Sequence, residues 1–361
     1  MMKTEKRIFL VAGGTGGHIW PAVSFGRWIE ENKPEVKVDF ICGNRPLEKE
    51  IYSAAEREPF VLSMTGSPLS GCFKEKCRRG RALFKAFSEV RGILKRTKPD
   101  FILLFGGYIS FPVLLAARMY RIPVAIQEQN AFAGKVTRFA AAKKIPVFSG
   151  WQDCAPLKDG QYVRTGVPVR NFKLSRQNEA WKSLGFGSAM PAGKKVVVFT
   201  GSLGSSSVKE QICGIAAQTP FSSWTFILPA AAESREQAAD NVYLLPKIWN
   251  TELLYSLADM AVMRAGASSL TEAGTLGIAT LVIPWEKAAD NHQFHNAVAF
   301  ASDNAALVWN GKDERQFAKK LLQLEKLSEE KQQITSSKLY NNAEGICSGL
   351  WAEIAPHFWK E

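Results

Sequence analysis

The sequence predicts an α/β protein made of two doubly wound, Rossmann-like domains that face each other across a cleft. Apolar, strand-like segments alternate with helical segments along nearly the whole chain. Segments such as 101–105 are apolar throughout, which is typical of a parallel sheet covered on both faces. With 361 residues the chain is too long for one ordinary core, and a second strand-first unit begins at Lys195.

The elements follow from this alternation. In the first half we predict strands at 7–12, 38–42, 100–105, 122–127 and 145–149. Helices are predicted at 19–32, 46–55, 81–97, 111–120 and 133–144. In the second half we predict strands at 196–199, 224–229, 241–245, 260–264, 279–284 and 305–309, and a last helix from Ile346 to Trp359. The polar segment from Thr165 to about Ala192 contains Pro and Gly and is predicted to be a linker.

Composition excludes several classes of protein. No run of 18 apolar residues exists, so no transmembrane helix is predicted. The N-terminal segment lacks the apolar region and cleavage site of a signal peptide. Six scattered cysteines without a C-x-x-C motif predict reduced thiols in the cytosol, with neither disulfides nor a zinc site.

The net charge of +12 lies entirely in the first half. Residues 1–150 carry 25 Lys and Arg against 13 Asp and Glu, and residues 151–361 carry 21 of each. Within the first half, residues 72–98 hold ten basic residues against two acidic ones. Leu83, Phe84, Phe87 and Leu94 are spaced as an apolar stripe of a helix.

Three interpretations of the basic segment 72–98 stay open. It is a core-facing helix with a basic outer face, an interfacial helix on anionic lipid headgroups, or a nucleic-acid-binding element. The third is weak because no known nucleic-acid-binding motif is present.

The turn Gly13-Gly14-Thr15-Gly16-Gly17-His18 follows the first predicted strand and opens a helix. Without side chains, its backbone N–H groups can approach a ligand, and the helix N-terminus favours a phosphate or diphosphate. His18 can exchange a proton near neutral pH. No Lys follows as in a P-loop, and Ile19 replaces the third Gly of a dinucleotide fingerprint. The alternative is a tight structural turn.

Three further turns point to anionic groups. Gly106-Gly107 and Gly201–Gly204 each follow an apolar strand, and Gly266–Ser269 offers backbone N–H groups and hydroxyls. Glu272 lies one helical turn later, where a carboxylate can accept both hydrogen bonds of a ribose diol. Ser269 to Glu272 also spells a capping box, which is the alternative role of Glu272.

A polar segment, 290–296, follows the strand predicted at 279–284. Its amide, imidazole and carboxylate groups suit sugar hydroxyls, which need paired donors and acceptors. The alternative is a helix start capped by Asp290 or Asn291.

Taken in order and spacing, these segments resemble the MurG family, the bacterial peptidoglycan glycosyltransferases of the lipid II step. The matching motifs are GGTGGH (13–18), GGYIS (106–110), EQNAFAG (128–134), TGVPVR (165–170), GSLGS (201–205), RAGASSLTEAGTLG (264–277) and DNHQFHNA (290–297). The resemblance spans nearly the whole chain. It implies a GT-B fold with an acceptor-binding, membrane-associating domain at 1–165, joined by a C-terminal helix at 343–361, and a UDP-sugar domain at 166–342.

The resemblance also implies the reaction. N-acetylglucosamine would pass from UDP-N-acetylglucosamine, with inversion, to the muramoyl 4-hydroxyl of undecaprenyl-diphospho-muramoylpentapeptide, converting lipid I to lipid II. No cofactor and no metal ion would be needed. The partners would be the two substrates and an anionic membrane surface, with no nucleic acid. The enzyme would be a peripheral protein at the cytoplasmic face of the inner membrane, with roles in cell-wall synthesis, cell shape and division.

The resemblance assigns roles to individual residues. His18 would be the general base, with Glu128 as the alternative. The donor residues would be Thr15, Gly16, Gly17, Asn130, Arg170, Ser202, Ile248, Arg264, Ala267, Ser268, Ser269, Glu272, His292, Gln293 and Asn296. The acceptor residues would be Gly13, Gly14, Gly106, Gly107, Tyr108, Ser110 and Gln129. The membrane contacts would be Phe73, Arg78, Arg79, Arg81, Leu83, Phe84 and Phe87.

The chain departs from the family pattern at several positions. Leu203 replaces Gln in the turn Gly201–Gly204, Gln127 replaces His before Glu128, and Thr137 stands where Asn is common. Two other functions stay open: a GT-B enzyme with another lipid acceptor, and a non-catalytic basic binder of nucleic acid or membrane.

Overall fold

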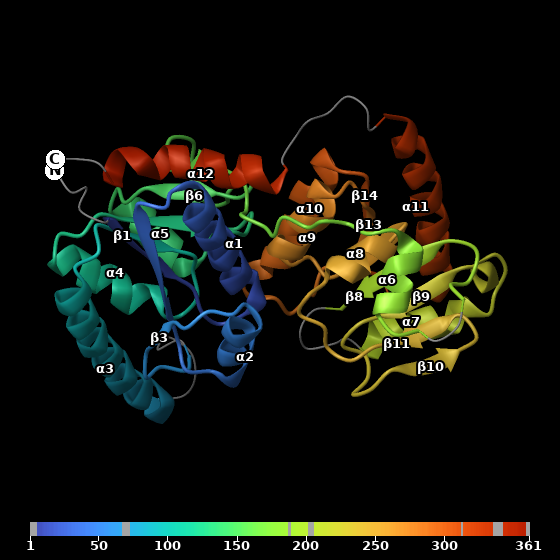
Figure 1. Cartoon of the computed structure of the whole chain (residues 1–361), viewed down its shortest axis with the longest axis horizontal. Helices are drawn as coiled ribbons and strands as arrows, with labels where there is room; N and C mark the ends of the chain where they lie inside the picture. Colours follow the sequence, from blue (N-terminus) through green and yellow to red (C-terminus); the bar gives the residue numbers. More distant parts are fainter. Residues whose placement is uncertain are drawn as a thin grey trace. The chain divides into compact units, whose positions relative to one another are not determined.

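The computed structural model describes residues 6–66, 73–186, 189–200, 206–311, 313–334 and 342–358, without the side chains of 73–79 and 331–334. The chain forms two compact units (Figure 1), Met1–Arg170 with Ala343–Glu361, and Asn171–Asn342. Each unit contains one predominantly parallel sheet with helices around it. The predicted class, α/β with two Rossmann-like domains, is confirmed.

The sheet of the first unit is parallel throughout, with the order β3-β2-β1-β4-β5-β6-β7. Its strands are β1 (Lys6–Val11), β2 (Val36–Cys42), β3 (Phe60–Val61), β4 (Phe101–Leu104), β5 (Val124–Glu128), β6 (Val147–Ser149) and β7 (Val163–Arg164). The two-residue strands β3 and β7 were not predicted because they are too short to show a pattern. The strand order reverses between β1 and β4, and ligands of doubly wound sheets bind at such a switch point.

Six helices accompany this sheet in the described part of the unit. They are α1 (Gly16–Asn32), α2 (Pro46–Ala54), α3 (Phe73–Thr97), α4 (Ser110–Met119), α5 (Lys135–Ala142) and α12 (Ala343–Phe358). The last of these lies against α1 (Figure 1): the rings of Trp28 and Trp351 are 6.3 Å apart, and Trp28 Nε1 donates to Glu344 Oε1 at 2.6 Å. The chain end thus packs on the first unit.

The second unit has the strand order β10-β11-β9-β8-β12-β13-β14. Its strands are β8 (Lys195–Phe199), β9 (Thr225–Leu228), β10 (Glu236–Ala239), β11 (Val242–Leu244), β12 (Met260–Met263), β13 (Ala279–Val282) and β14 (Ala306–Val308). All neighbours are parallel except β10, which runs antiparallel to β11. The exposed residues Glu236–Ala239 lack a strand pattern, so β10 was not predicted.

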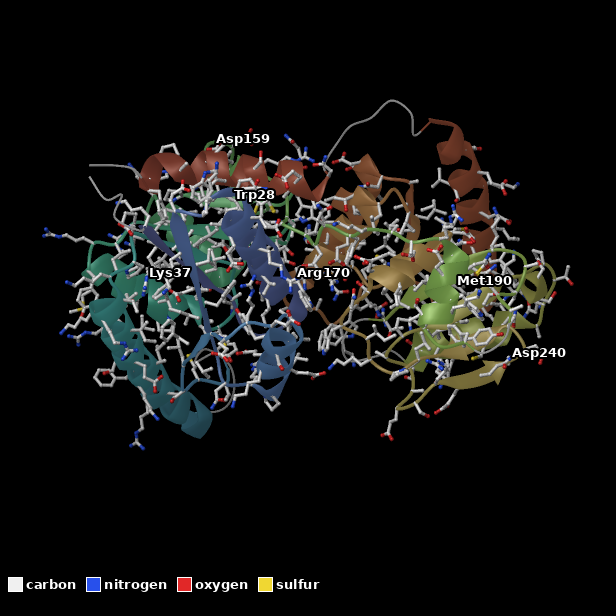
Figure 2. The ribbon with its side chains drawn as sticks, viewed as in Figure 1. Trp28, Lys37, Asp159, Arg170, Met190 and Asp240 are labelled. Atoms are coloured by element: carbon white, nitrogen blue, oxygen red, sulfur yellow. The ribbon has the colours of Figure 1, made fainter. Side chains whose placement is uncertain are left out.

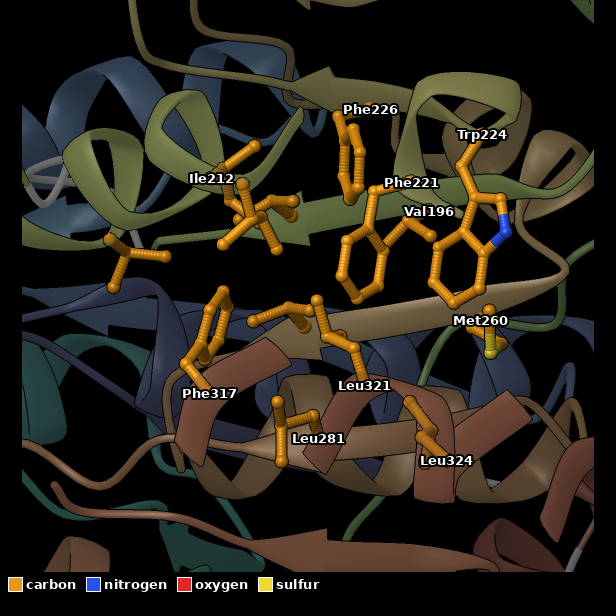
Figure 3. Packing of buried hydrophobic residues seen from close by; sticks show 14 of the residues in the cluster. Val196, Ile212, Phe221, Trp224, Phe226, Met260, Leu281, Phe317, Leu321 and Leu324 are labelled. Carbon is orange, nitrogen blue, oxygen red and sulfur yellow. The ribbon is translucent and has the colours of Figure 1, made fainter. Parts of the chain in front are cut away.

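The helices of the second unit cover both faces of its sheet. They are α6 (Gln177–Ser183), α7 (Ser206–Ala216), α8 (Glu252–Leu257), α9 (Ala267–Thr275), α10 (His292–Asp303) and α11 (Glu314–Ile334), with short 3-10 turns η1 (Phe221–Ser223) and η2 (Ala289–Asn291). Figure 3 shows the core where α7 and α11 meet the strands, with Ile212 contributed by α7 and with Phe317 and Leu321 contributed by α11.

The predicted linker 165–192 is wrong over part of its length, because it contains α6. Trp181 in α6 is only 1% exposed. Its ring stacks on Phe186 at 4.0 Å and meets the edge of Tyr243 at 5.2 Å. The segment is polar overall and shows no apolar periodicity, which is why the helix was not predicted. Its buried aromatic side chain, Trp181, anchors it to the core.

Helix α3 begins eight residues before the predicted start at 81 and divides the predicted apolar stripe. Leu94 is buried in the core of the first unit, and Leu83 and Phe87 pack partly buried against that core. Phe84 is instead 75% exposed. Leu83 and Phe84 point about 100° apart around the helix axis, and the core covers Leu83 but not Phe84. The stripe is therefore wrong as a single surface. No described helix is long and apolar enough to cross a membrane.

Cysteine labelling tests the burial of the thiols. Cys42, Cys154, Cys213 and Cys347 are free, and all except Cys213 are buried. Burial raises the pKa of Cys42, Cys154 and Cys347 to about 12 each, so these thiols stay protonated at pH 8. Because the thiolate is the reactive form, we expect iodoacetamide to label Cys213 before the other three. Site-resolved mass spectrometry measures this, and equally fast labelling of Cys42 in the native protein would contradict the packing.

Candidate functional site

Three loops meet at the switch point of the first unit, after β1, β4 and β5. The first leads into α1, whose first turn carries His18, and the other two carry Gly106 and Gln129. His18 Nδ1 lies 2.7 Å from Gln129 Oε1. A Cβ atom at Gly106 would lie 3.2 Å from the His18 ring, and the backbone there has a φ of +90°. Gly106 therefore leaves the space that the imidazole occupies.

The glycines of the first turn have packing roles. A Cβ atom at Gly107 would lie 2.2 Å from Gly13 O, so the two glycine turns touch only because Gly107 has no side chain. The Gly14 N–H donates to Glu48 Oε1 at 2.7 Å, which removes it from the predicted anion cradle. The side chain of the N-cap residue Thr15 makes no capping hydrogen bond, and a helix N-terminus favours an anion. Ligand contacts of Gly13 and Gly107 stay predictions.

Glu48 is a buried carboxyl group that the sequence analysis missed. Its Oε1 also accepts a hydrogen bond from the Tyr108 hydroxyl at 2.7 Å. Burial, followed by this hydrogen bond and the Glu48 charge, raises the pKa of Tyr108. The hydroxyl of Tyr108, predicted to bind the acceptor, is thus directed at the protein. A single Glu on the amphipathic helix α2 resembles a solvent-facing residue, so no signal in the sequence marks Glu48.

Glu128, the alternative base, fastens the loop that follows β5. Its Oε1 accepts from the N and Nδ2 atoms of Asn130 at 3.0 and 3.1 Å. Its Oε2 accepts from Gly134 N at 2.9 Å and from the Thr137 hydroxyl. Both oxygens are occupied in positioning this loop, which favours His18 over Glu128 as the base.

Other predicted residues of the first unit lie in α1 or contact α1 and the Gly106 loop. Ser110 Oγ donates to Gly106 O at 2.7 Å and so supports the loop beside the imidazole. Thr15 is the N-cap residue of α1, whose first turn contains Gly16 and Gly17. Arg170 (Figure 2) lies over the ring of Trp20 in the same helix, 4.4 Å from its centroid.

In the second unit, α9 starts at the end of β12, beside the reversal of strand order between β8 and β12. Gly266 is its N-cap residue and has no side chain that could cap the helix. The capping box is therefore wrong, because Ser269 lies inside the helix. Glu272 is 3% exposed, and its Oε2 accepts a hydrogen bond from the Tyr255 hydroxyl at 2.8 Å.

Tyr255 is the second residue that the sequence analysis missed. Its ring centroid lies 4.9 Å from that of Phe199 and 5.2 Å from that of Phe172. These aromatic contacts hold the Tyr255 hydroxyl toward Glu272. Tyr255 belongs to the apolar segment 253–257, where it is indistinguishable by pattern from a core residue.

The predicted diphosphate contacts gather at the start of α9. Ala267 and Ser268 lie in its first turn and are buried. Arg264 precedes them, with Nη1 at 3.3 Å from Ile283 O. Burial lowers the pKa of Arg264 while Glu286 opposes the shift, and a guanidinium stays charged at neutral pH. Ser202 lies outside the described residues. Ile248 packs partly buried against a core cluster that includes Leu254.

The polar segment 290–296 forms η2 and the start of α10. Asn291 is the N-cap residue of α10, but its side chain makes no capping hydrogen bond, so the predicted cap is wrong for Asn291. Gln293 Oε1 accepts from Trp285 N at 2.8 Å, and His292 Nδ1 lies 2.8 Å from Ala289 O. Both side chains are thereby oriented by backbone groups.

Asn296 is fully buried, and its contact with the sugar stays a prediction. Its Nδ2 donates to Ala265 O at 3.0 Å, so it supports the turn before α9. A hollow of about 360 Å³ opens on the surface of the second unit. Its lining residues are Pro284, Glu286, Asn291, Phe294 and Asn310.

Comparisons with known proteins agree with this architecture. The model of the glycosyltransferase family 28 N-terminal domain matches residues 8–148, and that of the C-terminal domain matches 195–346. A UDP-N-acetylglucosamine–N-acetylmuramyl-(pentapeptide) pyrophosphoryl-undecaprenol N-acetylglucosamine transferase of Prosthecochloris aestuarii is 32% identical over 310 residues, covering 83% of this chain and 84% of that protein. The protein of the same name from Phocaeicola vulgatus is 31% identical over 328 residues, covering 85% and 84%.

Solved structures share the fold. The crystal structure of Acinetobacter baumannii MurG aligns with a TM-score of 0.68 at 22% identity, over 95% of this chain and 98% of that one. A UDP-N-acetylglucosamine 2-epimerase aligns with a TM-score of 0.64 at 15% identity, over 99% and 98%. The predicted resemblance is thus confirmed: the chain belongs to glycosyltransferase family 28 and is a glycosyltransferase related to these N-acetylglucosamine transferases.

Proposed function

We propose that this protein transfers N-acetylglucosamine from UDP-N-acetylglucosamine to the muramoyl 4-hydroxyl of undecaprenyl-diphospho-muramoylpentapeptide. The names of relatives that match over most of the chain support both substrates. The structural observation that carries the proposal is His18, held by Gln129 beside Gly106 at the switch point of the first unit. A sugar hydroxyl is a poor nucleophile at neutral pH, and an imidazole there is a suitable general base.

The reaction is a displacement at the anomeric carbon. The 4-hydroxyl oxygen bonds to the anomeric carbon as the bond to UDP breaks, which inverts the configuration, and His18 takes the hydroxyl proton. UDP leaves with the electron pair of the broken bond. The N-terminus of α9 and the Arg264 guanidinium favour the leaving diphosphate. Glu272 accepts hydrogen bonds from the ribose, and His292 and Gln293 face the sugar.

The two units divide the substrates in this proposal. The first unit, with α12, takes the lipid acceptor and contacts the membrane, and the second takes the UDP-sugar. The division is supported by the charge, since the net charge of +12 lies within residues 1–150 and suits an anionic lipid surface. We place the protein peripherally at the cytoplasmic face of the inner membrane.

The exposed faces of α3 and α4 supply the membrane contact. Phe84 on α3 and Leu115 and Met119 on α4 are exposed apolar side chains. The basic residues Arg81 and Arg118 are exposed on the same two helices. Leu83 and Phe87 contribute only the parts that the core leaves open, and the side chains of Phe73, Arg78 and Arg79 lie outside the described part of the chain. Apolar groups beside basic ones suit an anionic bilayer surface.

Vesicle binding tests this surface through Phe84. We expect Phe84→Ser to weaken binding to vesicles containing anionic lipid about 10-fold, because a large apolar side chain no longer enters the interface. Cosedimentation with phosphatidylglycerol vesicles measures the change. The matched control is Val298→Ser, which removes an exposed apolar side chain from α10 of the second unit. Equal losses in the two variants would contradict the assignment to α3.

Thermal unfolding tests the donor site. We expect UDP-N-acetylglucosamine to stabilise the protein by about 2.7 kcal/mol at 100 times its Kd, because it binds only the folded state. ADP at the same concentration is the control and should produce a smaller shift. Stabilisation by RNA that falls steeply with salt, without any effect of UDP, would instead favour a nucleic-acid binder.

A further inference from the structure

We propose that Gln127 and Gln129 are positioning residues that hold His18 in the tautomer protonated on Nδ1, which leaves Nε2 as the proton-accepting atom. The inference rests on the proposed function for its effect on turnover. The tautomer itself is a property of the protein without substrate, so the two can fail separately.

The chain of hydrogen bonds starts at a backbone carbonyl. Gln127 Nε2 donates to Gly166 O at 2.9 Å. A carbonyl oxygen can only accept a hydrogen bond, so the amide nitrogen of Gln127 must face Gly166. Its Oε1 therefore faces the opposite way, toward Gln129.

The second amide is oriented in the same manner. Gln129 Nε2 donates to the backbone O atom of Gln127 at 2.8 Å and also to Gln127 Oε1. Both N–H groups of Gln129 are used in these bonds. Its Oε1 lies on the other side of the amide, 2.7 Å from His18 Nδ1. Because Oε1 carries no proton, Nδ1 must donate one.

Burial makes these orientations hard to reverse. Gln127 and Gln129 are 0% and 1% exposed. Turning the Gln127 amide would set its Oε1 against Gly166 O and its NH₂ group against that of Gln129. Turning the Gln129 amide would set its Oε1 against the O and Oε1 atoms of Gln127, which also only accept. The backbone O atom of Gln129 is also bound, by Trp151 Nε1 at 2.7 Å. This chain of hydrogen bonds from Gly166 O to His18 Nδ1, here called the relay, thus lies at the end of β5.

The consequence concerns the other imidazole nitrogen. Within the described residues, the side-chain hydrogen bonds of His18 are confined to Nδ1. A neutral imidazole in water prefers its proton on Nε2, where it would block proton acceptance by that atom. Gln129 reverses this preference. A partner on the second nitrogen that holds a histidine base in one tautomer can raise the reaction rate strongly.

Nitrogen-15 NMR of the histidine side chains in the substrate-free protein measures the tautomer directly. The chain has only four histidines, so the signals of His18 are identified by their loss in His18→Gln. We expect the neutral His18 ring to show a protonated Nδ1 and an unprotonated Nε2. A His18 that is mainly protonated on Nε2 would overturn the inference, whatever the activity of the protein.

Two variants connect the tautomer to turnover. Gln129→Leu removes the acceptor, so we expect His18 to become mainly protonated on Nε2 and kcat to fall at least about 10-fold, with KM for UDP-N-acetylglucosamine changed less than about 3-fold. Gln127→His should keep the Nδ1 proton and most of kcat, since a neutral imidazole offers one donor and one acceptor in place of the amide. The control, Ser149→Ala, removes a buried hydroxyl bonded to Trp151 O and should change neither quantity.

The outcomes separate the two claims. An unchanged tautomer in Gln129→Leu overturns the inference and leaves the role of His18 intact. A switched tautomer with unchanged kcat also overturns the inference, because the relay would not act on turnover, and it contradicts His18 as the base. If Gln129→Leu does not fold, the wild-type spectrum and Gln127→His still decide.

Discussion

Replacing His18 by alanine is expected to lower kcat for sugar transfer by about 10²–10⁴-fold, the usual contribution of a general base. The structure gives the physical reason. His18 stands in the first turn of α1, its Nδ1 is fastened to Gln129 Oε1, and Gly106 leaves room for its ring. Glu128, the alternative base, is less available than His18 because it holds the following loop with both oxygens.

The effect should appear in kcat and leave donor binding unchanged. The affinity for UDP, measured by calorimetry, should stay within about 2-fold of the wild type, since a base acts in the transition state. His357→Ala is the matched control. His357 lies on α12 beside Phe101, with ring centroids 6.3 Å apart, and has no part in the proposed site. Near-normal turnover of His18→Ala would remove His18 from its role.

Glu272→Gln is expected to weaken donor binding and to abolish discrimination between ribose and deoxyribose. A hydrogen bond to a charged group contributes about 1.5–3 kcal/mol, so KM for UDP-N-acetylglucosamine should rise roughly 10- to 100-fold. Glutamine keeps the shape of the side chain and an oxygen that can accept from the Tyr255 hydroxyl. The fold should therefore persist, which circular dichroism can verify.

A nucleotide comparison makes the assignment to ribose specific. The wild type should bind UDP more tightly than 2′-deoxy-UDP. Glu272→Gln should bind the two about equally, because removing the carboxylate and removing the 2′-hydroxyl abolish the same hydrogen bond. Tyr255→Phe should lie between the wild type and Glu272→Gln, since it leaves the carboxylate in place without its 2.8 Å hydrogen bond. Equal discrimination in the wild type and in Glu272→Gln would show that Glu272 does not bind the ribose.

Sequence reasoning succeeded where a local pattern determines structure. The apolar strands, such as β4 (Phe101–Leu104), and the glycine turns at their ends predicted two doubly wound sheets and the location of His18. It failed where a single side chain determines whether a segment is helical or which way it faces. Trp181 anchors α6 inside a polar stretch, and Phe84 leaves the face of its neighbours on α3.

The site shows the same division. The glycine turns could be recognised in the sequence, but the packing roles of the individual glycines could not. Gly107 allows the backbone of Gly13 to approach, and Gly106 makes room for the His18 ring. Glu48 and Tyr255 belong to ordinary amphipathic or apolar segments, and their importance comes from contacts 34 and 17 residues away along the chain, at Gly14 and Glu272. Such long-range pairings depend on tertiary packing and leave no local pattern.

The transfer assay tests the central claim most directly. The purified protein is incubated with labelled UDP-N-acetylglucosamine and either a lipid I analogue or a diacylglycerol, with His18→Ala as the inactive control. We predict transfer to the lipid I analogue alone, with the new sugar on the muramoyl 4-hydroxyl in inverted configuration. Transfer to the diacylglycerol, or no transfer to the lipid I analogue by a protein that binds UDP, would contradict the proposed function.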